Sequence, residues 1–150
     1  MALIELYSDK ILDIAANALQ PGRLASPDAS ARKVSRVCGS VIEVDIALRD
    51  GVIVGYGQEV SACALGQTSA AIVAREIVGT RADEFLALAV TMREMLKADG
   101  AAPGGKWSDL GYLEPVREFP ARHASTLLVF DAVCAAIEKV PLAQDAKERS

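Results

Sequence analysis

The chain is 150 residues long, which is the length of one average domain, and we expect a single domain over residues 1–150. Hydrophobic residues make up 51% and charged residues 24% of the composition, which excludes an intrinsically disordered chain and is typical of a globular protein. Acidic residues outnumber basic ones by 20 to 16, for a net charge of −4, and this balance argues against a nucleic-acid-binding protein.

Membrane and disulfide-rich classes are also disfavoured. No segment approaches the roughly 20 apolar residues that span a bilayer, and the first ten residues lack the pattern of a secretory signal. The three cysteines are an odd number and are widely spaced, which argues against a disulfide framework. We therefore expect a cytoplasmic protein without a membrane partner, whose thiols stay free for metal or sulfur chemistry.

The predicted elements begin with a helix over residues 7–19, for which Ser8 is a suitable N-cap and Pro21-Gly22 a stop. Residues 32–37 alternate weakly and predict an edge strand, whereas residues 41–49 alternate cleanly and predict a half-buried strand. The pair Asp50-Gly51 predicts a hairpin into a short strand at 52–54, because a type I′ turn needs positive φ at both positions.

The second half of the chain has helical spacing. Helices are predicted over residues 62–78, 82–98 and 120–140, with a Gly- and Pro-rich loop at 99–106 and one short turn within 107–115. Residues 144–150 form a charged end that we expect to be frayed. A helix, then consecutive strands, then helices is the order of an α+β fold with an antiparallel sheet.

Two of the cysteines stand at junctions between predicted elements. The motifs of common hydrolases and of phosphate-binding loops are absent, and a single histidine excludes a multi-histidine zinc site. Cys38 precedes a predicted strand, and Cys63 opens a predicted helix, where a thiolate is stabilised. Thiolates are preferred ligands of zinc and of iron–sulfur clusters, although a free cysteine is also a small buried hydrophobic residue. For Cys134, whose neighbours are apolar, we predict a place in the core.

Four segments, in order and spacing, resemble the IscU/NifU-type family of iron–sulfur cluster assembly scaffolds over roughly residues 6–139. Residues 7–13 resemble the first helix of the family. Cys38-Gly39-Ser40 stands where the family has Cys-Gly-Asp, and Cys63-Ala64-Leu65 stands where it has its second cysteine. Residues 119–128 resemble the segment in which a proline and a basic residue precede the third cysteine of the family.

The resemblance carries expectations about fold, cargo and partners. It implies an IscU/SufE-like α+β fold, with a three-stranded antiparallel sheet packed with helices. It also implies that three cysteines and an aspartate gather at one exposed end and hold a transient [2Fe–2S] cluster or a zinc ion. In such a system a cysteine desulfurase delivers the sulfur and recipient iron–sulfur apoproteins take the cluster. A scaffold of this kind is not an enzyme in the turnover sense.

The chain departs from the family pattern at two ligand positions. Ser40 stands where the aspartate is expected and Ser125 where the third cysteine is expected, and a hydroxyl is a poor substitute for a thiolate. His123 is a candidate replacement, and the set of Cys38, Cys63 and His123 resembles a zinc site with one open position. On an ideal helix His123 lies about 200° from Ser125, so it reaches the site only if the first turn is irregular or the helix begins later.

Arg122 matches the basic residue that precedes the third ligand of the family. Such a residue lowers thiolate pKa values or holds an anionic sulfur species, and the alternative is an ordinary surface charge.

We therefore predict a scaffold-like protein for iron–sulfur cluster assembly. It would accept sulfur from a cysteine desulfurase and bind a cluster or metal transiently at Cys38 and Cys63, with Ser40, His123 and Ser125 as neighbours or weak ligands. The alternative is a zinc-holding or metal-free sulfur acceptor or adaptor of the desulfurase that no longer builds clusters. A third hypothesis is an interaction protein that has kept the fold and lost the chemistry. A homodimer that completes a cluster with two cysteines from each chain also stays open.

Overall fold

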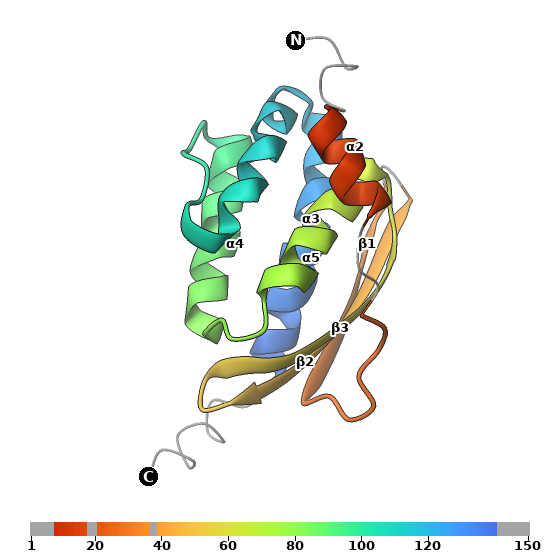
Figure 1. The fold of residues 1–150 in the computed structure, drawn as a ribbon, viewed down its shortest axis with the longest axis vertical. Coiled ribbons are helices and arrows are strands. Elements are labelled where there is room, and N and C mark those ends of the chain that lie inside the picture. Colours follow the sequence, from red (N-terminus) through yellow and green to blue (C-terminus); the bar gives the residue numbers. More distant parts are fainter. Residues whose placement is uncertain (1–7, 18–20, 37–38, 141–150) are drawn as a thin grey trace.

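A computed structural model describes residues 8–17, 21–36 and 39–140 of the chain. The strands are β1 (Ala29–Ser35), β2 (Ser40–Arg49) and β3 (Val52–Ser61), and they form one antiparallel sheet in the order β1-β2-β3. The α-helices are α2 (Asp9–Ala16), α3 (Ala64–Glu76), α4 (Ala82–Lys97) and α5 (His123–Lys139), and the 3₁₀ segments are η1 (Gly105–Glu118) and η2 (Pro120–Arg122). Helix α5 packs against β1 and β2, and α3 and α4 pack against α5, so the helices cover one face of the sheet (Figure 1). This is the predicted α+β fold with a three-stranded antiparallel sheet.

The predicted hairpin joins β2 to β3. Alternation along β2 buries Ile42, Val44 and Ile46, as predicted. Asp50 and Gly51 both have positive φ, 53° and 79°, as a type I′ turn requires.

Strand β3 is longer than the predicted strand at 52–54, because it continues to Ser61. Its polar second half lacks an apolar pattern, yet it pairs with β2 as far as the partners Val41 and Ser61. Backbone pairing therefore determines the length of this strand, which side-chain patterning alone underestimates.

Helix α2 begins as predicted. The amide of Ile11 donates to the Ser8 hydroxyl at 3.3 Å, which confirms Ser8 as the N-cap. Ile11 is buried, and its carbonyl accepts a hydrogen bond from Thr68 of α3 at 3.1 Å, so α2 docks on α3. The ends of the predicted helix, residues 7 and 18–19, lie outside the described residues.

The segment before α5 corrects the prediction of a loop to residue 106 and one short turn within 107–115. Residues Gly105–Glu118 instead form the 3₁₀ segment η1, which packs on α3 and α4. Its buried residues recur every third position, which matches the roughly three residues per turn of a 3₁₀ helix. These buried residues are Trp107, Leu110, Leu113 and Val116.

The last predicted helix, 120–140, is confirmed with an irregular start. Pro120–Arg122 form the 3₁₀ turn η2, and the α-helix begins at His123. Helix α5 is central, with buried residues around much of its circumference, because the sheet lies on one side and α3 and α4 on the other. The predicted frayed end, 144–150, lies outside the described residues. Among the helices described, none is long and apolar enough to cross a membrane.

Candidate functional site

Three of the predicted site residues meet where β2, α3 and α5 begin. Ser40 is the first residue of β2, Cys63 is the N-cap of α3, and Ser125 lies in the first turn of α5. The Ser125 hydroxyl oxygen lies 3.2 Å from the Cys63 sulfur and 3.3 Å from the Ser40 hydroxyl oxygen. The Ser125 hydroxyl therefore bridges the Cys63 thiol and the first residue of β2.

The two serines are buried, whereas the thiol is partly accessible. Ser125 is 0% and Ser40 is 1% exposed, and Cys63 has intermediate exposure. Gly66, in the first turn of α3, allows this close approach, because a Cβ atom there would lie 3.0 Å from the Ser125 hydroxyl and 2.8 Å from the Cβ of Ala62. Cys63 is thus the member of the trio that an incoming partner can reach.

The surroundings of Cys63 favour its thiolate form. Burial alone raises the pKa of the Cys63 thiol, but the Ser125 hydroxyl stabilises the thiolate and lowers the pKa. The Gly66 and Leu65 amides in the first turn of α3 and the positive charge of Arg122 lower it further, although no backbone amide makes a capping hydrogen bond of good geometry to the sulfur. The net effect is a pKa below the ordinary value. The charge of Arg122 makes the smallest of these lowering contributions, and its role in sulfur chemistry stays a prediction.

His123 is turned toward the preceding segment. Its Nε2 atom lies 3.1 Å from the carbonyl oxygens of both Val116 and Arg117, and the residue is buried. Because carbonyl oxygens only accept hydrogen bonds, Nε2 carries the proton in this arrangement. Nδ1 is then the ring nitrogen left to bind a metal.

The complete predicted ligand set is not tested by the structure. Cys38 lies outside the described residues, in the connection between β1 and β2. Within the part of the chain that the structure describes, no three His, Cys, Asp or Glu side chains lie close enough together to hold a metal ion. Metal binding by Cys38, Cys63 and His123 therefore stays a prediction.

One residue of this region was not among the predicted site residues. Ser35 ends β1 and is directly opposite Ser40 in the register of β1 with β2. It is 4% exposed, and its hydroxyl has no hydrogen-bond partner among the described residues. The register of β1 with β2 places Ser35 beside the site, and neither of the predicted strands, 32–37 and 41–49, contains that register in its own pattern.

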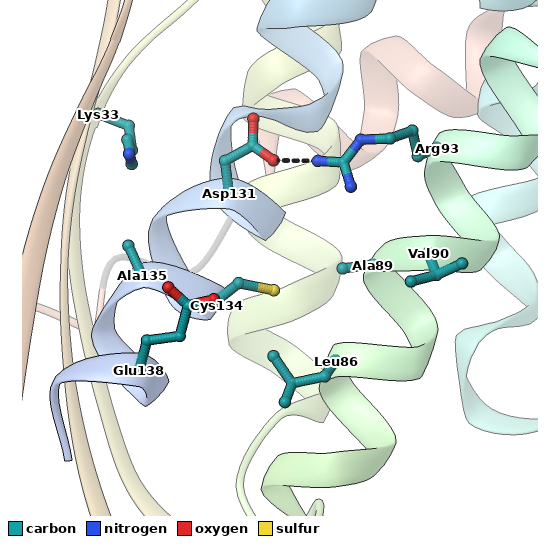
Figure 2. A pocket seen from close by; sticks show the side chains of 9 residues that line it. All are labelled: Lys33, Leu86, Ala89, Val90, Arg93, Asp131, Cys134, Ala135 and Glu138. Atoms are coloured by element: carbon teal, nitrogen blue, oxygen red, sulfur yellow. Dashed lines mark hydrogen bonds and ion pairs between the residues drawn. The ribbon is translucent and has the colours of Figure 1, made fainter. Parts of the chain in front are cut away.

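Cys134 lies away from this site, more than two turns further along α5. It packs against the core with part of its surface exposed, and it borders a pocket of about 500 Å³ between α4, α5 and β1 (Figure 2). Burial and the negative charges of Asp131 and Glu138 raise the pKa of its thiol to about 11. Arg93 donates to Asp131 at 2.7 Å across the same pocket. The Cys134 thiol therefore stays protonated at neutral pH.

The three-stranded antiparallel sheet with helices on one face places the chain in the class of NifU-like α+β domains. The chain is 47% identical to a nitrogen-fixing NifU-like protein (N-terminal) from Brucella abortus, whose crystal structure matches with a TM-score of 0.88 over 91% of this chain and 94% of that chain. It is 24% identical over 135 residues to the iron–sulfur cluster assembly scaffold protein IscU of Thermotoga maritima, covering 90% of this chain and 94% of the relative. No protein-family model matches the chain.

A structure from Fervidobacterium islandicum, described as a SUF-system scaffold, supports the fold alone. It has 18% identity and a TM-score of 0.81, covering 90% of this chain and 98% of that one. The chain belongs to the IscU/NifU-type family of iron–sulfur cluster assembly scaffolds.

Proposed function

We propose that this chain accepts sulfur on Cys63 and holds an iron–sulfur cluster or a metal ion there transiently, with Cys38 as the second thiolate. The observation that carries the proposal is the position of Cys63, a partly exposed thiol at the start of α3 whose pKa is held below its ordinary value. A thiolate at an accessible helix start is both the nucleophile that sulfur transfer needs and a ligand that iron and zinc prefer.

The partners follow from this chemistry and from the family. A cysteine desulfurase would present a persulfide to Cys63, and recipient apoproteins would take the finished cluster. The chain would not turn over a substrate as an enzyme does, because sulfur and metal leave it as cargo. We place this exchange in the cytoplasm, where thiols stay reduced.

We expect cluster binding to be weaker than in a scaffold with three cysteines. Ser40 and Ser125 occupy two of the four expected ligand positions, and both hydroxyls are buried within the protein. A hydroxyl must lose a proton of high pKa before it binds iron as strongly as a thiolate does. Two thiolates from one chain therefore hold a [2Fe–2S] cluster only loosely.

A second function is a zinc-holding or metal-free sulfur acceptor that serves the desulfurase without building clusters. The observation that favours it is that the polar groups near Cys63 make hydrogen bonds to one another or to backbone carbonyls. Ser125 bridges Ser40 and Cys63, and the Nε2 atom of His123 faces two carbonyl oxygens. Fewer ligand atoms are then free to complete a metal site.

The deciding measurement is the iron, zinc and acid-labile sulfide content of protein purified without oxygen. We expect iron and sulfide in similar amounts, lost in Cys63→Ala and kept in the matched control Cys134→Ala. Ser125→Cys should retain more iron than the parent, by about tenfold or more in affinity, because it adds a thiolate next to Cys63.

Other outcomes separate the two functions. Zinc alone, lost in Cys63→Ala, would favour the zinc-holding acceptor. No metal, but a persulfide on Cys63 after incubation with desulfurase and cysteine, would favour the metal-free acceptor. A parent protein that gains neither metal nor persulfide contradicts both.

A further inference from the structure

A row of serine hydroxyls runs from the end of the sheet to the Cys63 sulfur. The Ser40 and Ser125 hydroxyl oxygens are 3.3 Å apart, and Ser125 is 3.2 Å from the sulfur. Each hydroxyl has one proton to donate. When the sulfur carries negative charge, Ser125 donates to it and Ser40 donates to Ser125, so that both protons point along the row toward the sulfur.

Ser35 adds a third donor at the far end of this row. It pairs directly with Ser40 across β1 and β2, and paired residues of antiparallel strands project from the same face with Cβ atoms about 5 Å apart. Ser40 points toward α5, where it meets Ser125, so Ser35 projects toward α5 as well. Within the described part of the chain the buried Ser35 hydroxyl has no hydrogen-bond partner, which is an unfavourable state that an anionic ligand would relieve.

We propose that Ser35, Ser40 and Ser125 form a receptor for the outer, anionic sulfur of a persulfide on Cys63. The proposal deepens the proposed acceptance of sulfur and rests on it. The outer sulfur lies about 2.05 Å beyond the cysteine sulfur. It thereby extends the reach of Cys63 toward the hydroxyls. Hydrogen bonds to a charged acceptor inside a protein are stronger than those between neutral groups.

The loading step needs no oxidant beyond the donor. The Cys63 thiolate attacks the outer sulfur of a persulfide, R–S–SH, and a new sulfur–sulfur bond forms as the old one breaks. The group R–S⁻ leaves with the electron pair, and the proton on the outer sulfur passes to it or to solvent. The product is the Cys63 persulfide anion, which the serine row holds.

Serine at positions 40 and 125, in place of the aspartate and the cysteine of the family, suits the binding of an anionic persulfide better than the binding of a metal. A carboxylate at position 40 would repel an anionic sulfur, whereas a hydroxyl donates to it. A thiol at position 125, at the 3.2 Å that separates Ser125 from the Cys63 sulfur, could attack the inner sulfur of the persulfide. That attack would form a disulfide and expel hydrosulfide. Serine cannot carry out this discharge, so the persulfide is preserved.

The test measures the lifetime of the Cys63 persulfide. In a Cys38→Ala, Cys134→Ala background, Cys63 is the one cysteine left to carry sulfur. The protein is loaded either with cysteine desulfurase and cysteine or with inorganic polysulfide, the donor is removed, and one added sulfur atom is followed by intact mass under denaturing conditions. Substitutions Ser125→Ala, Ser40→Ala and Ser35→Ala are compared with Ser108→Ala, an exposed serine of η1. Thermal unfolding confirms that each variant is folded.

The expected result is an ordered loss. Ser125→Ala should shorten the lifetime about tenfold, since one hydrogen bond to a charged group is worth roughly that factor. Ser40→Ala and Ser35→Ala should shorten it less, and Ser108→Ala should not change it. Ser125→Cys should discharge the persulfide fastest, with release of sulfide and a disulfide to Cys63.

The outcomes separate this proposal from the function on which it rests. Equal lifetimes in the parent, Ser125→Ala and Ser40→Ala overturn the receptor and leave sulfur acceptance in place. Absence of persulfide in the parent with either donor overturns both. Sulfide that is present in native protein but lost on denaturation overturns the covalent persulfide, because it indicates bound hydrosulfide instead.

Discussion

Cys63 and Cys134 show how two thiols of one chain acquire different chemistry from their surroundings. Cys63 has a hydroxyl, two helix-start amides and a guanidinium near its sulfur, which together hold its pKa below the ordinary value despite partial burial. Cys134 lies on α5, where burial and, to a smaller extent, two carboxylates raise the pKa of its thiol to about 11. The difference between the two thiols lies in their hydrogen-bond donors and in the sign of the nearby charge.

We predict that iodoacetamide labels Cys63 at least tenfold faster than Cys134 at pH 8. With a pKa of about 11, only about one Cys134 in a thousand is a thiolate at that pH. Raising the pH to 9 should increase the Cys134 rate about tenfold and the Cys63 rate by less, because the pKa of the Cys63 thiol is lowered whereas that of Cys134 is raised. Peptide mass spectrometry of the Cys38→Ala protein follows the two sites separately. Equal labelling rates would contradict the assigned surroundings.

Sequence motifs and the junctions between predicted elements were sufficient to predict part of the site. Cys63 stands at a helix start, and Ser40 and Ser125 occupy ligand positions of the family, so their meeting was foreseeable. Ser35 was missed because its place depends on the register between two strands, which is a property of the hairpin and not of either strand. The orientation of His123 was also out of reach, because it depends on carbonyl groups that η1 brings near.

At the scale of elements, one buried carboxylate of β2 binds the segment that leads into β1. Asp45 of β2 projects from the face of the sheet opposite the helices and is 1% exposed. It accepts two hydrogen bonds from Arg23, at 2.6 and 2.8 Å. It accepts two more from the Leu24 amide, at 3.0 Å, and the Ser30 hydroxyl, at 2.5 Å. The pair with Arg23 is the largest cause that lowers the pKa of Asp45 to about 2.

We predict that Asp45→Ala lowers the free energy of unfolding by about 3 kcal/mol, because it removes the acceptor of the Leu24 amide and leaves Arg23 only its exposed bond to Glu43. Glu43→Ala is the matched control. Its carboxylate meets the same guanidinium at 2.9 Å but is 36% exposed, so its loss should cost less than about 1 kcal/mol. Urea unfolding at pH 7 measures both.

The same carboxylate gives a pH dependence with a defined sign. Its pKa is about 2 in the folded protein against an ordinary 3.8, so its contribution is present above about pH 4 and is lost as the pH falls through 2. The stability difference between the parent and Asp45→Ala should therefore shrink between pH 4 and pH 2. A difference that stays constant over this range would contradict the pairing.

The element scale also shows which parts of the fold local patterns determine. Strand β2 and the hairpin after it follow from alternation and the Asp50-Gly51 pair. The polar half of β3 and the length of η1 do not, because the first depends on pairing with β2 and the second on packing against α3 and α4. The bounds of segments that tertiary contacts stabilise are therefore harder to predict from local sequence patterns.

At the scale of the whole molecule, an aromatic cluster joins elements that are distant in sequence. Phe85 of α4 stacks on Phe130 of α5, with ring centroids 5.9 Å apart, and meets Trp107 of η1 edge-on at 6.1 Å. Phe85 is fully buried. Helix α5 thus carries Phe130 in the core and Ser125 in the candidate site, so core packing and site geometry depend on one helix.

We predict that Phe85→Ala lowers the stability of the whole chain by about 3–5 kcal/mol, whereas its neighbour Leu86→Ala, 37% exposed, changes it far less. If residues 1–150 fold as one domain, Trp107 fluorescence and far-ultraviolet circular dichroism should lose their native signals in a single coincident transition in both variants. Separate transitions would contradict a single domain. They would place Trp107 and α4 in a unit that unfolds apart from the sheet. In a cooperative domain, the loss of the Phe85 side chain affects Ser125 only through destabilisation of α5 together with the rest of the chain. The lifetime of the Cys63 persulfide in Phe85→Ala should therefore shorten only under conditions in which the whole chain begins to unfold.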